Sequence, residues 1–228
     1  MIADVRLNYP LASGETGIAG FNVFQGVNLT VPLSGLGAAA PSPAPMAPAA
    51  PLLAKFYDIF VRGWVLRDQK ANALDFDAEH PGRWTSRMSA LSAIMHTAEP
   101  DLAGFSGHGG KLILVHGDDD ALIPVGWSED YYRSVVARMG AGTVNGFVRF
   151  YTVPGYGHGA GTFVVDWDSL SALDRWVETG AAPAEPIAAD ANPAGAGRTR
   201  PLCRFPSWPR YKGAGDINQA ASFACAKG

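Results

Sequence analysis

The sequence lacks a strong excess of charge, a long apolar run and the basic-then-apolar start of a signal peptide. Its 228 residues carry a formal net charge of −3 and no basic run, which argues against a nucleic-acid partner. No apolar run approaches the roughly 20 residues that a membrane helix requires. We therefore expect neither nucleic acid nor a membrane among the partners of this chain.

Cysteine is also scarce, because Cys203 and Cys225 are the only two. Composition does not decide whether they form a disulfide, as in a secreted protein, or remain free thiols. Hydrophobic residues make up 47% and aromatic residues 11% of the chain, as in a globular protein. The length suffices for one domain with a sizeable core, or one and a half.

The first hundred residues change character along the chain. Residues 1–36 show no helical period and are expected to be irregular, and residues 37–51 are a low-complexity Ala/Pro insert that cannot build a core. Apolar residues at three- and four-residue spacing predict a helix over 52–64, and a second short helix is expected over 87–95. The segment before Asp101 is thus expected to be loosely organised.

The middle of the chain predicts an α/β unit. Leu112 to Val115 is an unbroken apolar run, typical of a strand that is covered on both faces in a parallel sheet. Ser128 is expected to cap a helix that ends at Gly140, and the aromatic and β-branched residues 147–153 predict the next strand. Strand, helix and strand in this order form a right-handed βαβ crossover.

The last third of the chain begins with one more predicted helix. Its cap is Asp166 or Asp168, and its end is Gly180. Residues 181–197 are again rich in Ala and Pro and are expected to be a linker to the cysteine-bearing tail.

An acid and a histidine follow the two predicted strands. Asp120 lies in the turn after the first strand, and His158 lies in a glycine-rich loop after the second. Catalytic residues of such sheets gather where the carboxyl ends of parallel strands meet. Asp120 would accept a hydrogen bond from His158 and stabilise the imidazolium that forms when His158 takes a serine proton. Alternatively, these residues form a solvated turn and an exposed loop; in both interpretations Asp118 and Asp119 are expected to be solvated.

The nucleophile that such a pair would serve is missing. No Gly-x-Ser-x-Gly elbow occurs in the sequence. Ser106 comes nearest, within Gly104-Phe105-Ser106-Gly107-His108, but it precedes a predicted strand instead of lying on a strand-to-helix turn.

A metal centre is the competing interpretation. A cluster of His116, His158 and the aspartates would have neither His-x-x-x-His nor Cys-x-x-Cys spacing. Asp75, Asp77 and Glu79 alternate as calcium ligands do, but no EF-hand glycine or terminal glutamate follows, so a solvated acidic loop is expected. We expect neither a metal nor a cofactor.

Several motifs from Asp101 onward occur together. They are Gly109-Gly110-Lys111-Leu112-Ile113-Leu114, Val153-Pro154-Gly155-x-Gly157-His158, Ala172-Leu173-x-x-Trp176-Val177-Glu178-x-Gly180, Arg200-Pro201-Leu202-Cys203, Tyr211-Lys212-Gly213-x-Gly215-Asp216-Ile217-Asn218 and Phe223-x-Cys225. This set resembles the tannase/feruloyl esterase family of α/β-hydrolases. The likeness is weaker over residues 9–77, where the family has the end of its lid domain.

The resemblance implies a carboxylic ester hydrolase that cleaves small-molecule esters of aromatic acids with a Ser-His-Asp triad. It assigns the acid to Asp120 and the base to His158, and it implies a disulfide between Cys203 and Cys225. It also implies a secreted or periplasmic parent enzyme. The calcium loop of the family's lid comes before the matched region and is not found in this chain.

The sequence departs from the family in two respects. The family has a cysteine directly after the catalytic histidine, bonded to one directly before the nucleophilic serine, and Gly159 stands at that place here. The nucleophile, the oxyanion hole and most of the sheet also precede the matched region in the family. Only the C-terminal part of such an enzyme is therefore represented.

The expected architecture is the C-terminal part of an α/β-hydrolase fold. Residues 1–100 would be a remnant of the lid domain with its insert, residues 101–180 the βαβα part of the core, and residues 181–228 the linker and the disulfide-bearing tail. Two parallel strands alone leave unpaired edges, so the missing N-terminal portion is an expected partner. The chain alone is predicted to be inactive. The alternative is a non-catalytic remnant or binding module.

Overall fold

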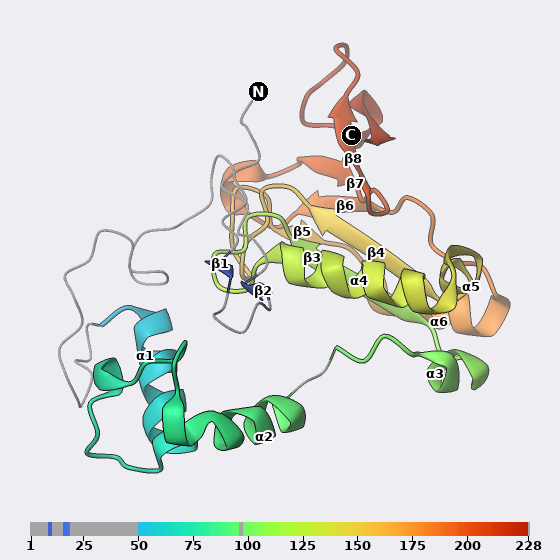
Figure 1. Cartoon of the computed structure of the whole chain (residues 1–228). Helices are drawn as coiled ribbons and strands as arrows, with labels where there is room; N and C mark the ends of the chain where they lie inside the picture. The colour runs from blue at the N-terminus through green and yellow to red at the C-terminus, as the bar shows by residue number, and fades with distance from the viewer. Residues whose placement is uncertain (1–8, 11–15, 19–49, 96–97, 228) are drawn as a thin grey trace. The chain divides into compact units, whose positions relative to one another are not determined.

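A computed structural model describes residues 9–10, 16–18, 50–95 and 98–227 (Figure 1). The described residues form two compact units, one of which ends at Glu99 while the other begins at Pro100. The expected irregular segment 1–36 and the Ala/Pro insert 37–51 lie almost wholly outside the described residues. Among the described helices, none combines the length and the apolar character that crossing a bilayer requires.

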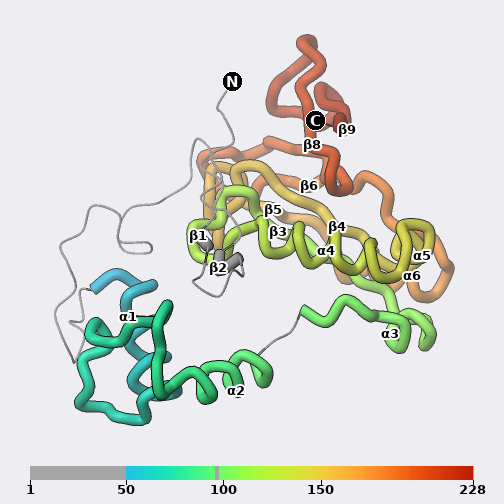
Figure 2. Tube along the Cα trace, in the orientation of Figure 1, coloured from blue at the N-terminus to red at the C-terminus, as the bar shows by residue number. Residues whose placement is uncertain are grey.

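The first unit is mainly helical. Helix α1 (Leu52–Ile59) continues into a π-helical segment (Phe60–Leu66), and α2 (Thr85–Met95) follows after two short 3-10 turns. Figure 2 traces the path of the chain from α1 to α2. Strands β1 (Tyr9–Pro10) and β2 (Thr16–Ile18) pair antiparallel. Both predicted helices are therefore present.

Only part of the apolar stripe on the first helical segment is buried within its unit. Val61 and Val65 are almost fully enclosed, whereas Phe56, Ile59 and Trp64 are at least half exposed.

The second unit is built on two parallel strands, β3 (Leu112–Gly117) and β4 (Val148–Val153). They pair over their whole length, from Leu112 opposite Val148 to Gly117 opposite Val153. Helices α4 (Val125–Met139) and α5 (Ala141–Asn145) connect them, and α4 lies along the strands in Figure 1. The predicted strand, helix, strand unit is confirmed.

Side chains of these strands alternate between two faces, and each face is covered by an apolar cluster. The buried residues on the side of α4 and α5 are Val135, Val144, Phe147 and Val148. Those on the other side are Tyr151, Val153, Phe163, Ala188 and Leu202. Coverage on both faces explains why the strands are continuous apolar runs in the sequence.

Helix α4 begins three residues before the predicted cap. Pro124 occupies the cap position and Val125 is the first helical residue, so Ser128 lies inside the first turns. The Ser128 hydroxyl instead contacts His116, with Oγ 2.7 Å from Nδ1. A tertiary partner has therefore replaced the local capping bond. The predicted end at Gly140 is confirmed, with φ at +83°.

Helix α6 (Ser169–Thr179) is confirmed as well. It begins at Asp168, whose carboxylate accepts a backbone hydrogen bond of 3.0 Å from the first turn. Trp176 is buried, whereas Leu170 and Val177 are exposed.

Residues 181–197 differ from the expected linker. They contain β6 (Ile187–Asp190), which pairs antiparallel with β5 (Val165–Asp166) and with β7 (Thr199–Pro201). Ala188 is fully buried in the cluster behind β4. A small side chain is suited to this close contact, and composition does not reveal it.

The tail ends in a hairpin of β8 (Ser207–Tyr211) and β9 (Phe223–Lys227). Cys203 is fully buried and forms a disulfide with Cys225, which confirms the pairing that the family resemblance implies. The hairpin is therefore tied covalently to the segment that follows β7.

The two edges of the β3–β4 pair differ. The outer edge of β4 is covered, because Tyr151 forms an antiparallel bridge with Arg204 and the Phe205 N–H donates to the Phe150 carbonyl at 2.8 Å. Among the described strands, β3 pairs with β4 alone. The other edge of β3, which has no partner among the described strands, presents backbone donors and acceptors to which a further strand can pair.

Candidate active site

The carboxyl ends of β3 and β4 are joined by backbone hydrogen bonds. The Asp118 N–H donates to the Val153 carbonyl and the Asp119 N–H to the Tyr156 carbonyl, each at 3.0 Å. Gly117 permits this approach, because a Cβ there would lie 2.0 Å from the Tyr156 oxygen. The turn after β3 and the loop after β4 are thus held side by side.

Asp120 and His158 meet at this edge. His158 Nδ1 lies 3.0 Å from Asp120 Oδ2. A carboxylate only accepts, so the Nδ1 atom carries the proton and the neutral ring keeps Nε2 as an acceptor. This is the tautomer that a histidine needs to remove a proton from a hydroxyl group.

The acid of the pair is buried and the base is accessible. The Asp120 side chain is 7% exposed, compared with 52% for His158. Asp120 Oδ1 accepts from the backbone N–H groups of Leu122 at 2.8 Å and Ile123 at 2.9 Å. Both carboxylate oxygens are therefore occupied, and the orientation of the carboxylate is fixed by its own turn.

His116, which the sequence analysis considered as a metal ligand, is a further member of the site. Its Nε2 lies 3.0 Å from the Ile123 carbonyl and its Nδ1 lies 2.7 Å from Ser128 Oγ. Nε2 thus donates, and Nδ1 accepts from the hydroxyl. His116 Nε2 is also 3.7 Å from Asp120 Oδ2. The ring holds the acidic turn against the start of α4, a role that spacing does not reveal.

Asp119 is not the solvated neighbour that the sequence suggests. It is 3% exposed, and neither of its carboxylate oxygens has a hydrogen-bond partner among the described residues. Burial raises its pKa to about 6, since a charged carboxylate is costly away from water. The backbone of this turn is bound to the histidine loop through the Asp119 N–H and the Tyr156 carbonyl.

Ser106 does not belong to the site. It lies on the short helix α3 (Ala103–Gly107), and its hydroxyl donates to the Ala103 carbonyl at 3.2 Å. This helix precedes β3, whereas Asp120 follows the carboxyl end of the same strand. The two residues are therefore at opposite ends of β3.

The acidic residues 75–79 do not fit a calcium site. Asp77 accepts from the backbone N–H groups of Glu79 at 2.9 Å and His80 at 3.1 Å, and also contacts the His80 ring at 2.9 Å. The His80 hydrogen bonds lower the pKa of this exposed carboxylate. Among the described residues, no three His, Cys, Asp or Glu side chains converge as metal ligands do.

Comparison with known proteins places this geometry in context. The family model described as tannase and feruloyl esterase matches residues 5–226. An uncharacterized esterase of Agrobacterium fabrum is 39% identical over 221 residues, which are 96% of this chain and 39% of that protein. Mono(2-hydroxyethyl) terephthalate hydrolase of Piscinibacter sakaiensis is 38% identical over 196 residues, which are 83% of this chain and 29% of that enzyme.

A solved structure agrees with these sequence relatives. The crystal structure of feruloyl esterase B from Aspergillus oryzae superposes with a TM-score of 0.63 at 25% identity, and covers 74% of this chain and 36% of that one. The chain thus spans about two fifths or less of the length of the proteins it matches.

Proposed function

The chain belongs to the tannase and feruloyl esterase family, and from this premise we propose that it contributes the acid and the base of a carboxylic ester hydrolase. Asp120 is the acid and His158 the base. The observation that carries the proposal is the 3.0 Å contact between His158 Nδ1 and Asp120 Oδ2. It leaves Nε2 as the atom that accepts the proton of a serine nucleophile and later returns it to the leaving alcohol.

The substrate we propose is a small ester of an aromatic acid. The relatives named above include a feruloyl esterase and a mono(2-hydroxyethyl) terephthalate hydrolase, whose names both describe such esters. In the proposed reaction the serine attacks the ester carbonyl, Asp120 stabilises the imidazolium of His158, and water then releases the acid. The sequence of steps requires no cofactor.

The nucleophile comes, in this proposal, from polypeptide outside the given sequence. The chain contains no Gly-x-Ser-x-Gly elbow, and a further parallel strand would pair at the edge of β3 that has no partner among the described strands. The disulfide between Cys203 and Cys225 fits an enzyme that works outside the cytoplasm. The alternative is a binding module that kept this edge of the fold without its chemistry.

Complementation tests the proposal. The purified chain alone is expected to leave methyl ferulate intact. Co-expression with the part of the Agrobacterium fabrum esterase that this chain does not match is expected to restore turnover. Asp120→Asn should then lower kcat by about 10⁴-fold, as loss of the triad acid does, and His158→Ala should abolish turnover.

The matched control is Asp174→Asn, which changes an exposed carboxylate on α6 and should leave turnover unchanged. Turnover that survives His158→Ala would refute the assignment of the base. A complex that forms with the complementing part but never hydrolyses the ester would favour the binding module.

A further inference from the structure

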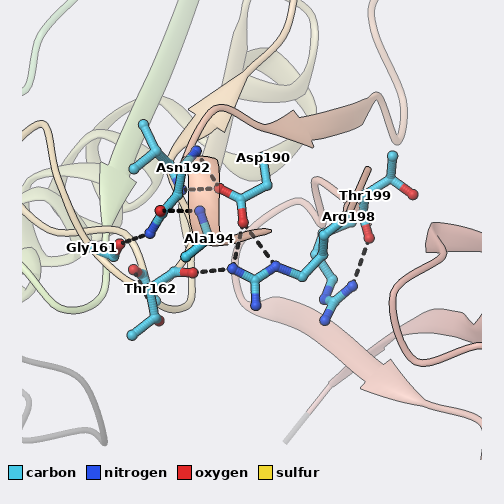
Figure 3. Close-up of polar contacts among 10 residues, drawn as sticks. Gly161, Thr162, Asp190, Asn192, Ala194, Arg198 and Thr199 are labelled. Atoms are coloured by element: carbon cyan, nitrogen blue, oxygen red, sulfur yellow. Dashed lines mark hydrogen bonds and ion pairs between the residues drawn. The ribbon is translucent and has the colours of Figure 1, made fainter. Parts of the chain in front are cut away.

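Three side chains from the connection between β6 and β7 hold the chain where it returns from His158 (Figure 3). Asn192 Nδ2 donates to the Gly161 carbonyl at 2.8 Å, and the Arg198 guanidinium donates to the Thr162 carbonyl. We call Asp190, Asn192 and Arg198 the Asp190 clamp. It binds carbonyls three and four residues after the histidine.

Asp190 binds both the segment after His158 and the other two residues of the clamp. Its side chain is fully buried. Oδ1 accepts from the Val164 N–H at 2.8 Å and from the Asn192 N–H at 2.9 Å, while Oδ2 accepts from Arg198 Nε at 2.8 Å. Burial by itself would raise the pKa of Asp190, but these donors outweigh it and lower the pKa. The carboxylate is therefore held charged, and Arg198 is held beside it.

The chain packs closely around this carboxylate. A Cβ at Gly195 would lie 1.9 Å from Asp190 Oδ2 and 2.6 Å from Arg198 Nη2. The turn of residues 193–195 can approach the ion pair only because a glycine is there. Such close packing fixes the position of Arg198, whose fork spans both Asp190 and the loop carbonyl.

The histidine loop therefore has two attachments. Its entry is bound to the acidic turn by the Asp119 N–H at Tyr156, and its exit is bound by the clamp at Gly161 and Thr162. Between them, the loop closes on itself through the Gly157 N–H and the Ala160 carbonyl at 2.6 Å. His158 lies at the tip, and the following residue is Gly159, which has no side chain to fasten it.

We propose that the Asp190 clamp positions His158 against Asp120. The inference rests on the proposed function in that it treats His158 as the base. Asp190, Asn192 and Arg198 touch no reacting atom, so they are positioning residues. The clamp does by hydrogen bonds at the exit of the loop what a covalent link next to the histidine could do.

The experiment compares conservative variants in the full chain. Arg198→Lys keeps the positive charge but loses the fork that reaches Asp190 and Thr162 together. Asn192→Asp keeps the acceptor for the Ala194 N–H, bound at 2.9 Å, but replaces the donor to Gly161 with an acceptor. Neither change removes a large apolar contact.

Arg200→Lys is the matched control. Arg200 lies on β7 two residues after Arg198 and stacks on the Phe223 ring, with its Cζ 4.2 Å from the centroid. Within the described residues, its guanidinium donates to the Thr199 carbonyl at 2.7 Å and makes no hydrogen bond to the histidine loop. It therefore reports the cost of losing an arginine in this sheet without loss of the clamp.

NMR of the ¹⁵N-histidine-labelled chain gives the first readout, the Nδ1–H resonance of His158 in its bond to Asp120. We expect this resonance in the wild type and in Arg200→Lys. In Arg198→Lys and Asn192→Asp we expect the proton to exchange with solvent so rapidly that the resonance is no longer observed. Exchange of the Val164 amide with solvent should accelerate in Arg198→Lys by roughly tenfold or more, as for loss of a charge-assisted hydrogen bond.

Clamp variants that keep the Nδ1–H resonance as Arg200→Lys does would overturn the inference, and so would a wild-type chain without this resonance. If Arg198→Lys fails to fold, Asn192→Asp decides alone. Failure of the proposed function is recognised separately, because a complemented enzyme without turnover can still show a clamp-dependent Nδ1–H resonance.

Discussion

Two aspartates of this chain are buried to a similar degree and have opposite surroundings. Asp119, in the turn after β3, is 3% exposed, and Asp190, at the end of β6, is 8% exposed. Asp190 accepts hydrogen bonds from two backbone N–H groups and from Arg198. Asp119 has no such donor among the described residues. Their pKa values accordingly move apart, that of Asp190 downward and that of Asp119 up to about 6.

The contrast distinguishes a buried carboxylate whose hydrogen bonds come from its own segment from one that has none among the described residues. At Asp190, the buried carboxylate and the Arg198 guanidinium form an ion pair within one segment of the chain. At the edge that carries Asp119, Asp120 and His158, a carboxylate is without donors and β3 is without a second neighbour among the described strands. The Asp190 carboxylate is therefore satisfied by its own segment of the chain, whereas the Asp119 carboxylate is satisfied by none of the described residues.

The largest effect on stability is expected at Asp190, the buried carboxylate that has hydrogen-bond donors. Asp190→Ala leaves the Arg198 guanidinium without its ion-pair partner and removes the acceptor of two backbone N–H groups. We expect the free energy of unfolding to fall by about 3–5 kcal/mol, as for other broken buried ion pairs, measured by urea denaturation. An equal loss in Asp174→Ala, an exposed aspartate on α6, would contradict this reason.

The substitution Asp119→Asn should have the opposite sign at neutral pH. A pKa raised from 3.8 to about 6 corresponds to a cost of about 3 kcal/mol for keeping the carboxylate charged in the folded chain. Removing that charge should raise the free energy of unfolding at pH 7 by up to about this amount, because the amide bears no charge.

The pH dependence tests the cause of this gain. The folded chain binds the Asp119 proton more tightly than the unfolded chain does, so wild-type stability falls as the pH rises from about 4 to above 6. The advantage of Asp119→Asn should therefore vanish at pH 4, where the carboxyl group is protonated in the folded chain. A gain that is the same at pH 4 and pH 7 would contradict the burial of a charged group as its cause.

The smallest effect is expected from Ser128→Ala. This change removes the hydrogen bond between the Ser128 hydroxyl and His116 Nδ1. A neutral hydrogen bond contributes about 1 kcal/mol, so the loss should be well below that of Asp190→Ala. Denaturation midpoints at pH 7 measure it, with Ser134→Ala on the same helix as a control for changes in helix propensity. A decrease in the free energy of unfolding above about 3 kcal/mol would mean that the His116 ring stabilises the turn by more than its two hydrogen bonds account for.

The sequence allowed the central unit to be predicted because its patterns are local. The apolar run from Leu112, the strand that ends at Val153 and the glycine at 140 each define an element by themselves. The positions of Asp120 and His158 followed from the strands, since side chains at the carboxyl ends of parallel strands meet. The disulfide required the family resemblance, because two cysteines alone do not fix their state.

What the sequence concealed depends on contacts between distant residues. Ser128 has the composition of a helix cap, but His116, twelve residues earlier, takes its hydroxyl. Residues 181–197 have the composition of a linker, but Ala188 fills a space that only Tyr151 and its neighbours define. Asp119 belongs to a run of three acidic residues that suggests exposure to solvent, but its side chain is buried in the fold.

The close approach of the two strand ends at Gly117 restricts which residues position 117 can tolerate. Any side chain there would place its first carbon 2.0 Å from a backbone oxygen of Tyr156, and that oxygen cannot move without carrying the histidine loop away from the acidic turn. In a saturation library selected for ester turnover by the complemented enzyme, codon 117 should return glycine alone. The four glycine codons would be interchangeable there, so silent changes would be the only variation tolerated.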